Sequence, residues 1–133
     1  MSKNKVVKEA IKMCERAHAP FSNYKVGSAV EVKSGEVIGG CNIESSSYGL
    51  TCCAERVALY RAVAEGYNKF KSIAVATKNA VMPCGACRQV IWELCSEIPV
   101  HICDMHGLVK TIYSSKLIPV SYTHLTLPTI YSV

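Results

Sequence analysis

The sequence predicts an α/β fold. We expect one domain, a three-layer α-β-α sandwich in which helices cover both faces of a mixed sheet of about five strands. The chain has 133 residues, about one domain's worth, with an ordinary globular composition of 50% hydrophobic and 19% charged residues. Apolar residues recur at helical spacing in some segments and form short continuous runs in others. These segments follow the order α-β-β-α-β-α-β-β, in which short helices connect successive strands.

The N-terminal third begins with an amphipathic helix over roughly 3–17. Its apolar side chains recur at steps of three and four residues: Val7, Ala10, Ile11, Cys14 and Ala17. Pro20 closes this helix, because proline cannot continue the backbone hydrogen bonds. Two strands follow, over 25–33 and 36–43. The residues between them, Lys33-Ser34-Gly35-Glu36, contain a glycine and suit a hairpin turn.

The rest of the domain alternates helices and short strands. Residues 54–65 are strong helix formers, and Gly66 follows where a left-handed residue ends a helix. Residues 72–77 form a continuous apolar run, which is typical of a strand buried on both faces. The remaining elements are a helix over 85–95 and strands over 99–103 and 108–112, with His106-Gly107 at the turn between the last two.

The domain is expected to span residues 1–119, since no repeat or linker interrupts this part of the chain. Residues 120–133 differ abruptly in composition, because they are rich in Thr, Ser and Leu and carry no Lys, Arg, Asp or Glu. That composition is more typical of translated adaptor or vector sequence than of an evolved element. We therefore expect this C-terminal tail to contribute no buried contact beyond residue 122.

Charge and cysteine content exclude several classes of protein. The net charge of +5 is mild, and its one dense cluster, Lys3 to Lys12, has no interleaved aromatic residues for stacking on nucleic acid. No apolar run reaches the roughly 18 residues of a membrane span, and the N-terminus lacks the apolar core of a signal peptide. Eight cysteines without a secretion signal indicate reduced thiols in a cytoplasmic protein, held by metal or burial.

Two cysteine-bearing segments at predicted helix starts carry the candidate chemistry. They are Cys53-Ala54-Glu55-Arg56 and Pro83-Cys84-Gly85-Ala86-Cys87-Arg88-Gln89. The positive end of a helix lowers a thiol pKa and so makes the thiolate available as a metal ligand. Two helices leaving adjacent strands in the same direction would bring the three sulfurs together. Three protein ligands leave the fourth tetrahedral position of Zn²⁺ open, which is the catalytic pattern.

Glu55 lies two residues after Cys53, where it can take protons from a water on the metal and return them. The Cys-x-x-Cys pair could instead be a redox pair, but no thioredoxin-like pattern accompanies it. A structural zinc site would need a fourth ligand. Cys52 is adjacent to Cys53 and should point elsewhere, and the remaining cysteines are most simply small buried hydrophobes. The four histidines lie outside both segments: His18, His101, His106 and His124.

The two segments resemble the signature of zinc-dependent deaminases. The three-cysteine version is similar to the small cytidine deaminases of pyrimidine nucleoside salvage. The similarity extends from about residue 5 to residue 119 and includes Gly40-Cys41-Asn42-Ile43-Glu44, in the family's order and approximate spacing. It implies a cytidine deaminase-like fold, a Zn²⁺ cofactor and a homotetramer. It also implies hydrolytic deamination of cytidine and deoxycytidine to uridine and deoxyuridine, with release of ammonia.

The resemblance assigns roles residue by residue. It makes Cys53, Cys84 and Cys87 the zinc ligands and Glu55 the catalytic glutamate. Three contacts to the substrate follow in the same way: Asn42 and Glu44 bind the ribose hydroxyls, and the backbone of Ala54 faces the leaving amine. Tyr24 stands where the family usually has a phenylalanine lining the base pocket, so its hydroxyl is a departure. Tyr122 falls at the place of an aromatic that reaches a neighbouring subunit's active site.

Arg56 and Arg88 have an expected electrostatic role. Three thiolates on Zn²⁺ leave a net charge of −1, which makes a bound water a poorer acid. Arginines that donate hydrogen bonds to the sulfurs withdraw that charge and restore the acidity. The competing interpretation is that both are exposed helix arginines.

Three other functions stay open at this stage. A deaminase of another cytosine-bearing compound, such as blasticidin S, would share the zinc motifs but has less use for both Asn42 and Glu44. A polynucleotide deaminase typically has histidine in place of the first cysteine and needs a basic groove. A non-catalytic, zinc-stabilised binding module would not need Glu55 and would have a fourth ligand.

Overall fold

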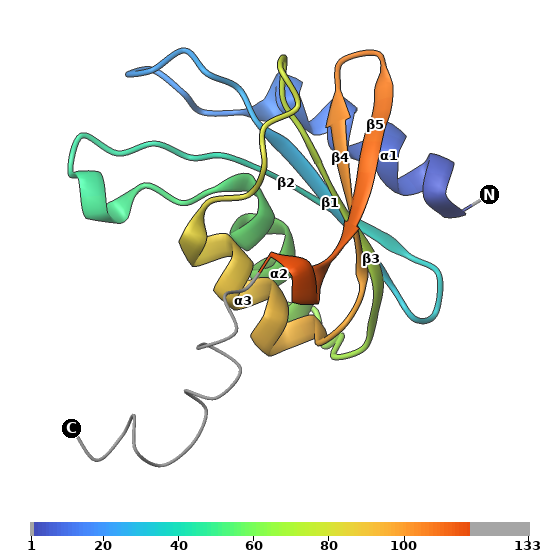
Figure 1. Cartoon of the computed structure of the whole chain (residues 1–133). Helices are drawn as coiled ribbons and strands as arrows, with labels where there is room; N and C mark the ends of the chain where they lie inside the picture. The colour runs from blue at the N-terminus through green and yellow to red at the C-terminus, as the bar shows by residue number, and fades with distance from the viewer. Residues whose placement is uncertain (1, 118–133) are drawn as a thin grey trace, which may run out of the picture.

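The computed structural model describes residues 2–117 and contains a five-stranded sheet with helices on both faces (Figure 1). This confirms the predicted fold class and the order of the eight main elements. Their bounds are α1 Ser2–Met13, β1 Gly27–Val32, β2 Val37–Cys41, α2 Ala54–Ala64, β3 Phe70–Ala76, α3 Gly85–Cys95, β4 Pro99–Asp104 and β5 Gly107–Tyr113. Short 3-10 turns cover Cys14–Arg16 (η1), Tyr48–Leu50 (η2) and Ser114–Lys116 (η3). The C-terminal tail, with Tyr122, lies outside the described residues.

The sheet is mixed, in the strand order β2-β1-β3-β4-β5. β1 pairs antiparallel with both β2 and β3, and β4 pairs antiparallel with β5. β3 and β4 are parallel, since helix α3 returns the chain to the same end of the sheet between them. Gly27, the first residue of β1, pairs with both Cys41 and Ala76, so β2 and β3 end where β1 begins. Helices α2 and α3 start beyond this end of the sheet.

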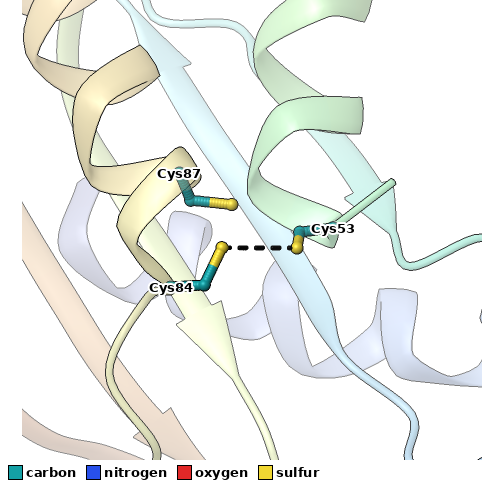
Figure 2. Close-up of side chains that lie close together, drawn as sticks. All are labelled: Cys53, Cys84 and Cys87. Atoms are coloured by element: carbon teal, nitrogen blue, oxygen red, sulfur yellow. Dashed lines mark hydrogen bonds between the residues drawn. The ribbon is translucent and has the colours of Figure 1, made fainter. Parts of the chain in front are cut away.

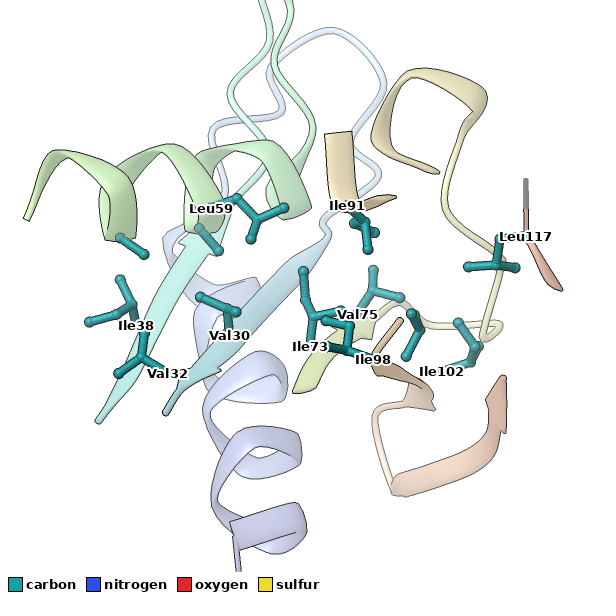
Figure 3. Packing of buried hydrophobic residues seen from close by; sticks show 13 residues of the cluster. Val30, Val32, Ile38, Leu59, Ile73, Val75, Ile91, Ile98, Ile102 and Leu117 are labelled. Carbon is teal, nitrogen blue, oxygen red and sulfur yellow. The ribbon is translucent and has the colours of Figure 1, made fainter. Parts of the chain in front are cut away.

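Two hydrophobic layers enclose the sheet. Helix α1 packs on one face and α2 and α3 on the other (Figure 1). In β3 the side chains alternate: Ala74 and Ala76 belong to the α1 layer, and Ile73 and Val75 to the α2–α3 layer with Leu59 and others (Figure 3). The predicted burial of this strand on both faces is therefore confirmed. Full burial of a side chain such as Leu59 contributes roughly 1.5–3 kcal/mol to stability.

Glycines let the helices lie close to the sheet. A Cβ on Gly40 of β2 would stand 2.4 Å from the backbone nitrogen of Ala58 and 2.7 Å from the carbonyl oxygen of Ala54, both in α2. On the opposite face, a Cβ on Gly27 would stand 2.0 Å from the carbonyl oxygen of Ala10 in α1. Because these neighbours are backbone atoms, they cannot rotate away. Gly40 thus fixes how closely the first turn of α2 approaches the sheet.

The end of the first helix and the start of the first strand differ from the prediction. The first helix ends at Met13, and the chain leaves its 3-10 extension at Ala17 in an extended conformation. The first hairpin strand begins at Gly27 rather than near residue 25. Before it, the Val26 N–H donates to the side-chain oxygen of Asn42, and the Tyr24 carbonyl oxygen accepts from the side-chain nitrogen of Asn42. A side chain with both a donor and an acceptor thus makes two hydrogen bonds to the backbone before the strand start.

Candidate metal centre and active site

Three cysteine sulfurs lie close together beyond the C-terminal ends of β2 and β3. The Sγ atoms of Cys53, Cys84 and Cys87 all lie within 4.8 Å of one another, and those of Cys53 and Cys84 are 3.6 Å apart (Figure 2). Tetrahedral zinc with Zn–S bonds of about 2.3 Å would place its sulfur ligands about 3.8 Å apart. The trio fits such an ion. Among the residues that the structure describes, these three form the only group of this kind.

Helix starts position the sulfurs. Cys53 precedes α2 and Cys84 precedes α3, both with extended backbone, while Cys87 lies in the first turn of α3 (Figure 2). The two strands that lead to these helices are not neighbours, contrary to the prediction. β1 lies between them, and the helices converge on the same face of the sheet. Cys87 is buried and Cys84 is exposed, so the centre opens to one side.

The charge on the sulfurs suits metal binding. A hydrogen bond shared with Cys87, helped by Arg56, lowers the pKa of the Cys53 thiol to about 5. The same hydrogen bond, together with burial, raises the pKa of Cys87. The Arg56 Nη2 atom lies 3.4 Å from the Cys53 Sγ atom and donates a hydrogen bond to it. A lowered thiol pKa favours the thiolate form, which is the form that binds a metal ion, so Cys53 is suited to be a metal ligand.

Glu55 is buried in the first turn of α2, with 4% of its surface exposed. Burial raises the pKa of its carboxyl to about 7. A carboxyl that titrates near neutral pH can both accept and donate a proton, which is what general acid–base catalysis requires. Glu55 therefore has the position and the proton affinity for that role.

Two adjoining cavities meet at the sulfurs and share Thr51, Cys53 and Cys84 as lining residues. The inner cavity, of about 190 Å³, is mostly apolar. Its other lining residues include Glu55, Ala54, Asn42, Val26, Thr77, Val81 and Met82. The outer cavity, of about 590 Å³, is more polar, and Ser22, Glu44, Ser45 and Arg56 contribute to it. The pair suits a flat base with a hydroxyl-bearing substituent.

The two predicted sugar-binding residues line different cavities. Asn42 faces the inner one, and its amide is held by Val26 N at 3.0 Å and by Tyr24 O at 2.8 Å. Glu44 faces the outer one, where its carboxylate accepts hydrogen bonds from the backbone N–H groups of Phe21 and Ser22 and from the Ser22 hydroxyl. The hydroxyl bond lowers the pKa of Glu44. Both residues therefore line the combined space of the two adjoining cavities.

Three other predicted residues occupy distinct positions. Ala54 is fully buried and lines the inner cavity. Tyr24 is half-buried and does not line either cavity; its hydroxyl donates to Asn79 Oδ1. The prediction that Arg88 donates to a sulfur is corrected. Its guanidinium donates to the carbonyl oxygens of Pro83 at 2.7 Å and Leu117 at 3.3 Å, and so braces the backbone before Cys84.

Sequence reasoning missed the loop residues of the site. Thr51 and Thr77 line the cavities, and the Thr77 hydroxyl accepts a hydrogen bond from Val81 N at 3.0 Å. No motif marks these residues, because they reach the site through the tertiary fold. Ser22 could have been suspected, since the short polar segment after Pro20 must turn the chain towards β1.

The chain is similar to known deaminases. The family described as "Cytidine and deoxycytidylate deaminase zinc-binding region" matches residues 1–102. A cytidine deaminase of Halalkalibacterium halodurans is 46% identical over 92% of this chain and 96% of its own. The crystal structure of cytidine deaminase from Burkholderia pseudomallei shares 42% identity and a TM-score of 0.86, over 90% of this chain and 98% of that one. A blasticidin-S deaminase of Bacillus cereus is a more distant relative, 36% identical over 77% of this chain and 79% of its own.

The fold and the three-sulfur centre define a zinc-binding α/β enzyme of the deaminase class. The chain belongs to the cytidine and deoxycytidylate deaminase family. This confirms the family resemblance stated from the motifs. Within residues 2–117, no helix is long and apolar enough to cross a membrane.

Replacing Arg56 by alanine should move the pH dependence of the reaction. Without the guanidinium, the negative charge of three thiolates on a zinc ion would be less compensated. A water bound to that zinc would then hold its proton more tightly. The ionisation that activates the nucleophile then needs a higher pH, so the profile of kcat/KM against pH should shift to the alkaline side. Zinc affinity should also fall. Arg61→Ala, further along the same helix, is the control. An unchanged pH profile in Arg56→Ala would show that Arg56 has no electrostatic role at the metal centre.

Proposed function

We propose that this chain is a zinc-dependent hydrolase that converts cytidine and deoxycytidine to uridine and deoxyuridine with release of ammonia. The observation that carries the proposal is a cluster of three cysteine sulfurs, two of which line the same cavity as the buried carboxyl of Glu55. Family membership and the cytidine deaminases among its relatives support it. In this proposal Cys53, Cys84 and Cys87 hold the zinc. The test is ammonia release from cytidine, deoxycytidine, cytosine and blasticidin S by the zinc-loaded protein.

The mechanism assigns proton transfer to Glu55. Zinc held by Cys53, Cys84 and Cys87 would lower the pKa of a water molecule, so that this water can lose a proton and act as a nucleophile at neutral pH. Glu55 takes up the proton that is released and delivers it to N3 of the pyrimidine, which makes C4 electrophilic. The water oxygen adds to C4, and Glu55, deprotonated again, takes the second proton of that oxygen and gives it to the amine. The C4–N bond then breaks, a C4 carbonyl forms and ammonia leaves. Its pKa of about 7 suits this exchange.

The surrounding residues bind and orient the substrate. The inner cavity has apolar walls at Val26, Val81 and Met82, which suit the faces of a pyrimidine ring. The Ala54 backbone lies beside Glu55 and faces the leaving amine in this proposal. Glu44, a carboxylate at the outer cavity, accepts hydrogen bonds from sugar hydroxyls, and Asn42 contacts the sugar at the boundary of the two cavities. Tyr24 does not line the base-binding cavity itself but lies two residues before Val26, which does.

Loss of the sugar contacts should lower efficiency at the distant C4 atom, because binding energy from the sugar is used at the reacting centre. Asn42→Ala and Glu44→Ala should each reduce kcat/KM for cytidine by about tenfold or more, the loss expected from one hydrogen bond to the sugar. Free cytosine should be a very poor substrate of the unaltered enzyme. Zinc content, measured by metal analysis, should not change. Equal kcat/KM for cytosine and cytidine would refute the sugar contacts.

A deaminase of blasticidin S is the second candidate, and the Bacillus cereus relative is the observation that favours it. Higher identity and coverage place the cytidine deaminases ahead of it. A non-catalytic zinc module has less support, because it has no use for the buried Glu55. A polynucleotide deaminase also has less support, because among the described residues Arg56 is the one basic residue that lines these two cavities, and it donates to Cys53.

We further propose a homotetramer of the pyrimidine salvage pathway in the cytoplasm, where reducing conditions keep zinc-binding thiols intact. Two large apolar side chains support assembly, because Tyr48 and Leu50 are 94% and 74% exposed beside the outer cavity. The deaminase domain would comprise residues 1–119.

Truncations test the domain boundary and the C-terminal tail together. A chain stopped after Tyr122 should remain a tetramer and deaminate cytidine, because residues 123–133 have the composition of a foreign segment. A chain stopped after Pro119 should also assemble but bind substrate more weakly if Tyr122 acts as the aromatic of the family. Light scattering beside the activity assay measures both. A monomer after removal of 123–133 would make the tail part of the interface.

A further inference from the structure

Tyr24 carries a hydroxyl that neither the metal centre nor the proton transfer uses. This hydroxyl donates a hydrogen bond to Asn79 Oδ1, and the Lys78 ammonium lies 5.5 Å from the centre of the tyrosine ring. Tyr24 belongs to the segment that leads into β1, whereas Asn79 belongs to the loop between β3 and α3. The contact therefore joins two segments that lie 55 positions apart in the sequence.

Both joined segments form walls of the inner cavity. Val26 lines it from the Tyr24 segment, and Thr77, Val81 and Met82 line it from the Asn79 loop. Tyr24 itself does not line the cavity, so the hydroxyl cannot act by touching a substrate there. A change at the Tyr24–Asn79 contact would reach the cavity through Val81 and Met82.

A residue with a left-handed backbone lies next to each end of the contact. Asn23, beside Tyr24, has φ of 58°, and Ala80, beside Asn79, has φ of 52°. Asparagine tolerates this left-handed conformation, but alanine adopts it only at a cost. Such residues persist where surrounding contacts fix them. On one side of Ala80 is the Tyr24–Asn79 bond, and on the other is the bond from Val81 N to the Thr77 hydroxyl.

The Tyr24 side is anchored independently. The Asn42 amide donates to the Tyr24 carbonyl oxygen at 2.8 Å and accepts from Val26 N at 3.0 Å. A fixed tyrosine backbone makes its hydroxyl a firm attachment point for the more exposed Asn79 loop. The direction of the effect is therefore from Tyr24 to the loop.

We propose that Tyr24 is a positioning residue whose hydroxyl, by holding Asn79, keeps the loop 77–82 in place as one wall of the pyrimidine-binding cavity. The proposal rests on the proposed function, since it takes the inner cavity as the place of the base. It gives the tyrosine hydroxyl, absent from a phenylalanine at this position, a role in substrate affinity rather than in proton transfer. KM is thus the parameter that depends on the contact.

The test combines single and double variants. Tyr24→Phe and Asn79→Ala should each raise KM for cytidine about two- to tenfold, the range for loss of one hydrogen bond. The double variant should match the single variants, because all three remove the same contact. kcat should change by less than KM. Asn79→Asp keeps the acceptor oxygen and should restore KM close to that of the unaltered enzyme.

A second readout needs no substrate. In the zinc-loaded protein, backbone amides of residues 78–82 should exchange with solvent deuterium about two- to tenfold faster in Tyr24→Phe, by the same loss of one hydrogen bond. Tyr113→Phe, which removes the hydroxyl of an exposed tyrosine on β5, is the matched control and should alter neither measurement.

The outcomes separate cleanly. Unaltered KM and exchange in Tyr24→Phe would overturn the proposal, as would effects of the single variants that multiply in the double variant. If no form of the protein deaminates cytidine but the exchange at 78–82 still rises, the proposed function fails while the loop contact stands. If cytidine is deaminated and exchange does not change, the positioning role of Tyr24 fails alone.

Discussion

Glutamine in place of Glu55 should reduce deamination of cytidine by about a hundredfold to ten-thousandfold, the usual contribution of a general acid–base group. Glutamine has the same shape, so the three sulfurs should still bind about one zinc per chain. Substrate should still bind, because the residues proposed to contact the base and the sugar are unchanged. Single-turnover kinetics beside metal analysis would separate lost proton transfer from lost zinc.

A stability measurement guards against misfolding as the cause. Burial raises the folded pKa of Glu55 from 4.5 to about 7, so in the metal-free chain its stabilising, protonated form is lost as pH rises through that interval. Glu55→Gln stays neutral, and its free energy of unfolding should lose this pH dependence. Glu15→Gln, an exposed change in η1, is the control. Near-normal turnover of Glu55→Gln would remove Glu55 from the mechanism.

Alanine at Gly40 should damage both the fold and the metal centre. Its Cβ would meet the α2 backbone at 2.4 Å, so the helix must move away from β2. Overpacking of this kind costs about 1–3 kcal/mol of the free energy of unfolding. The displaced helix carries Glu55 and follows Cys53 directly. Since a misplacement of about 1 Å can cost a hundredfold in rate, we expect kcat/KM and zinc affinity to fall together.

Gly49→Ala provides the comparison. A Cβ at Gly49 would meet no atom within 4 Å, and the residue lies in η2 near the outer cavity. Denaturant unfolding and zinc titration of the two variants should therefore diverge, with Gly49→Ala close to the unaltered protein. Equal stability of the two would show that α2 does not depend on the close approach at Gly40.

Much of the fold could be predicted because local signals and burial agree. Helix α3 has the predicted bounds of 85–95, and Gly66 has the positive φ expected after a helix, at 101°. The strand order could not be predicted in the same way. β1 lies between β2 and β3 because of pairings more than forty residues apart, such as Gly27 with Ala76, which no local pattern encodes. For the same reason the sequence suggested adjacent strands before α2 and α3.

The candidate site divides along similar lines. The ligands and Glu55 follow from helix starts and spacing, which are local features of the chain. Arg56 reaches Cys53 one helical turn away, within the same element. Arg88 differs, because its guanidinium donates a hydrogen bond to the Leu117 carbonyl oxygen, 29 positions away in the sequence, and a local pattern does not predict that partner. The partner of Tyr24 is likewise a tertiary feature, so the sequence could mark its hydroxyl as unusual but not explain it.

Ammonia release from cytidine during a zinc titration tests the central claim most directly. Protein stripped of metal under reducing conditions would be reloaded stepwise, with zinc per chain and turnover measured on the same samples. Activity should rise in proportion to bound zinc and reach its maximum at about one zinc per chain, as three ligands with one open position require. A folded chain that binds one zinc and releases no ammonia from cytidine would contradict the account.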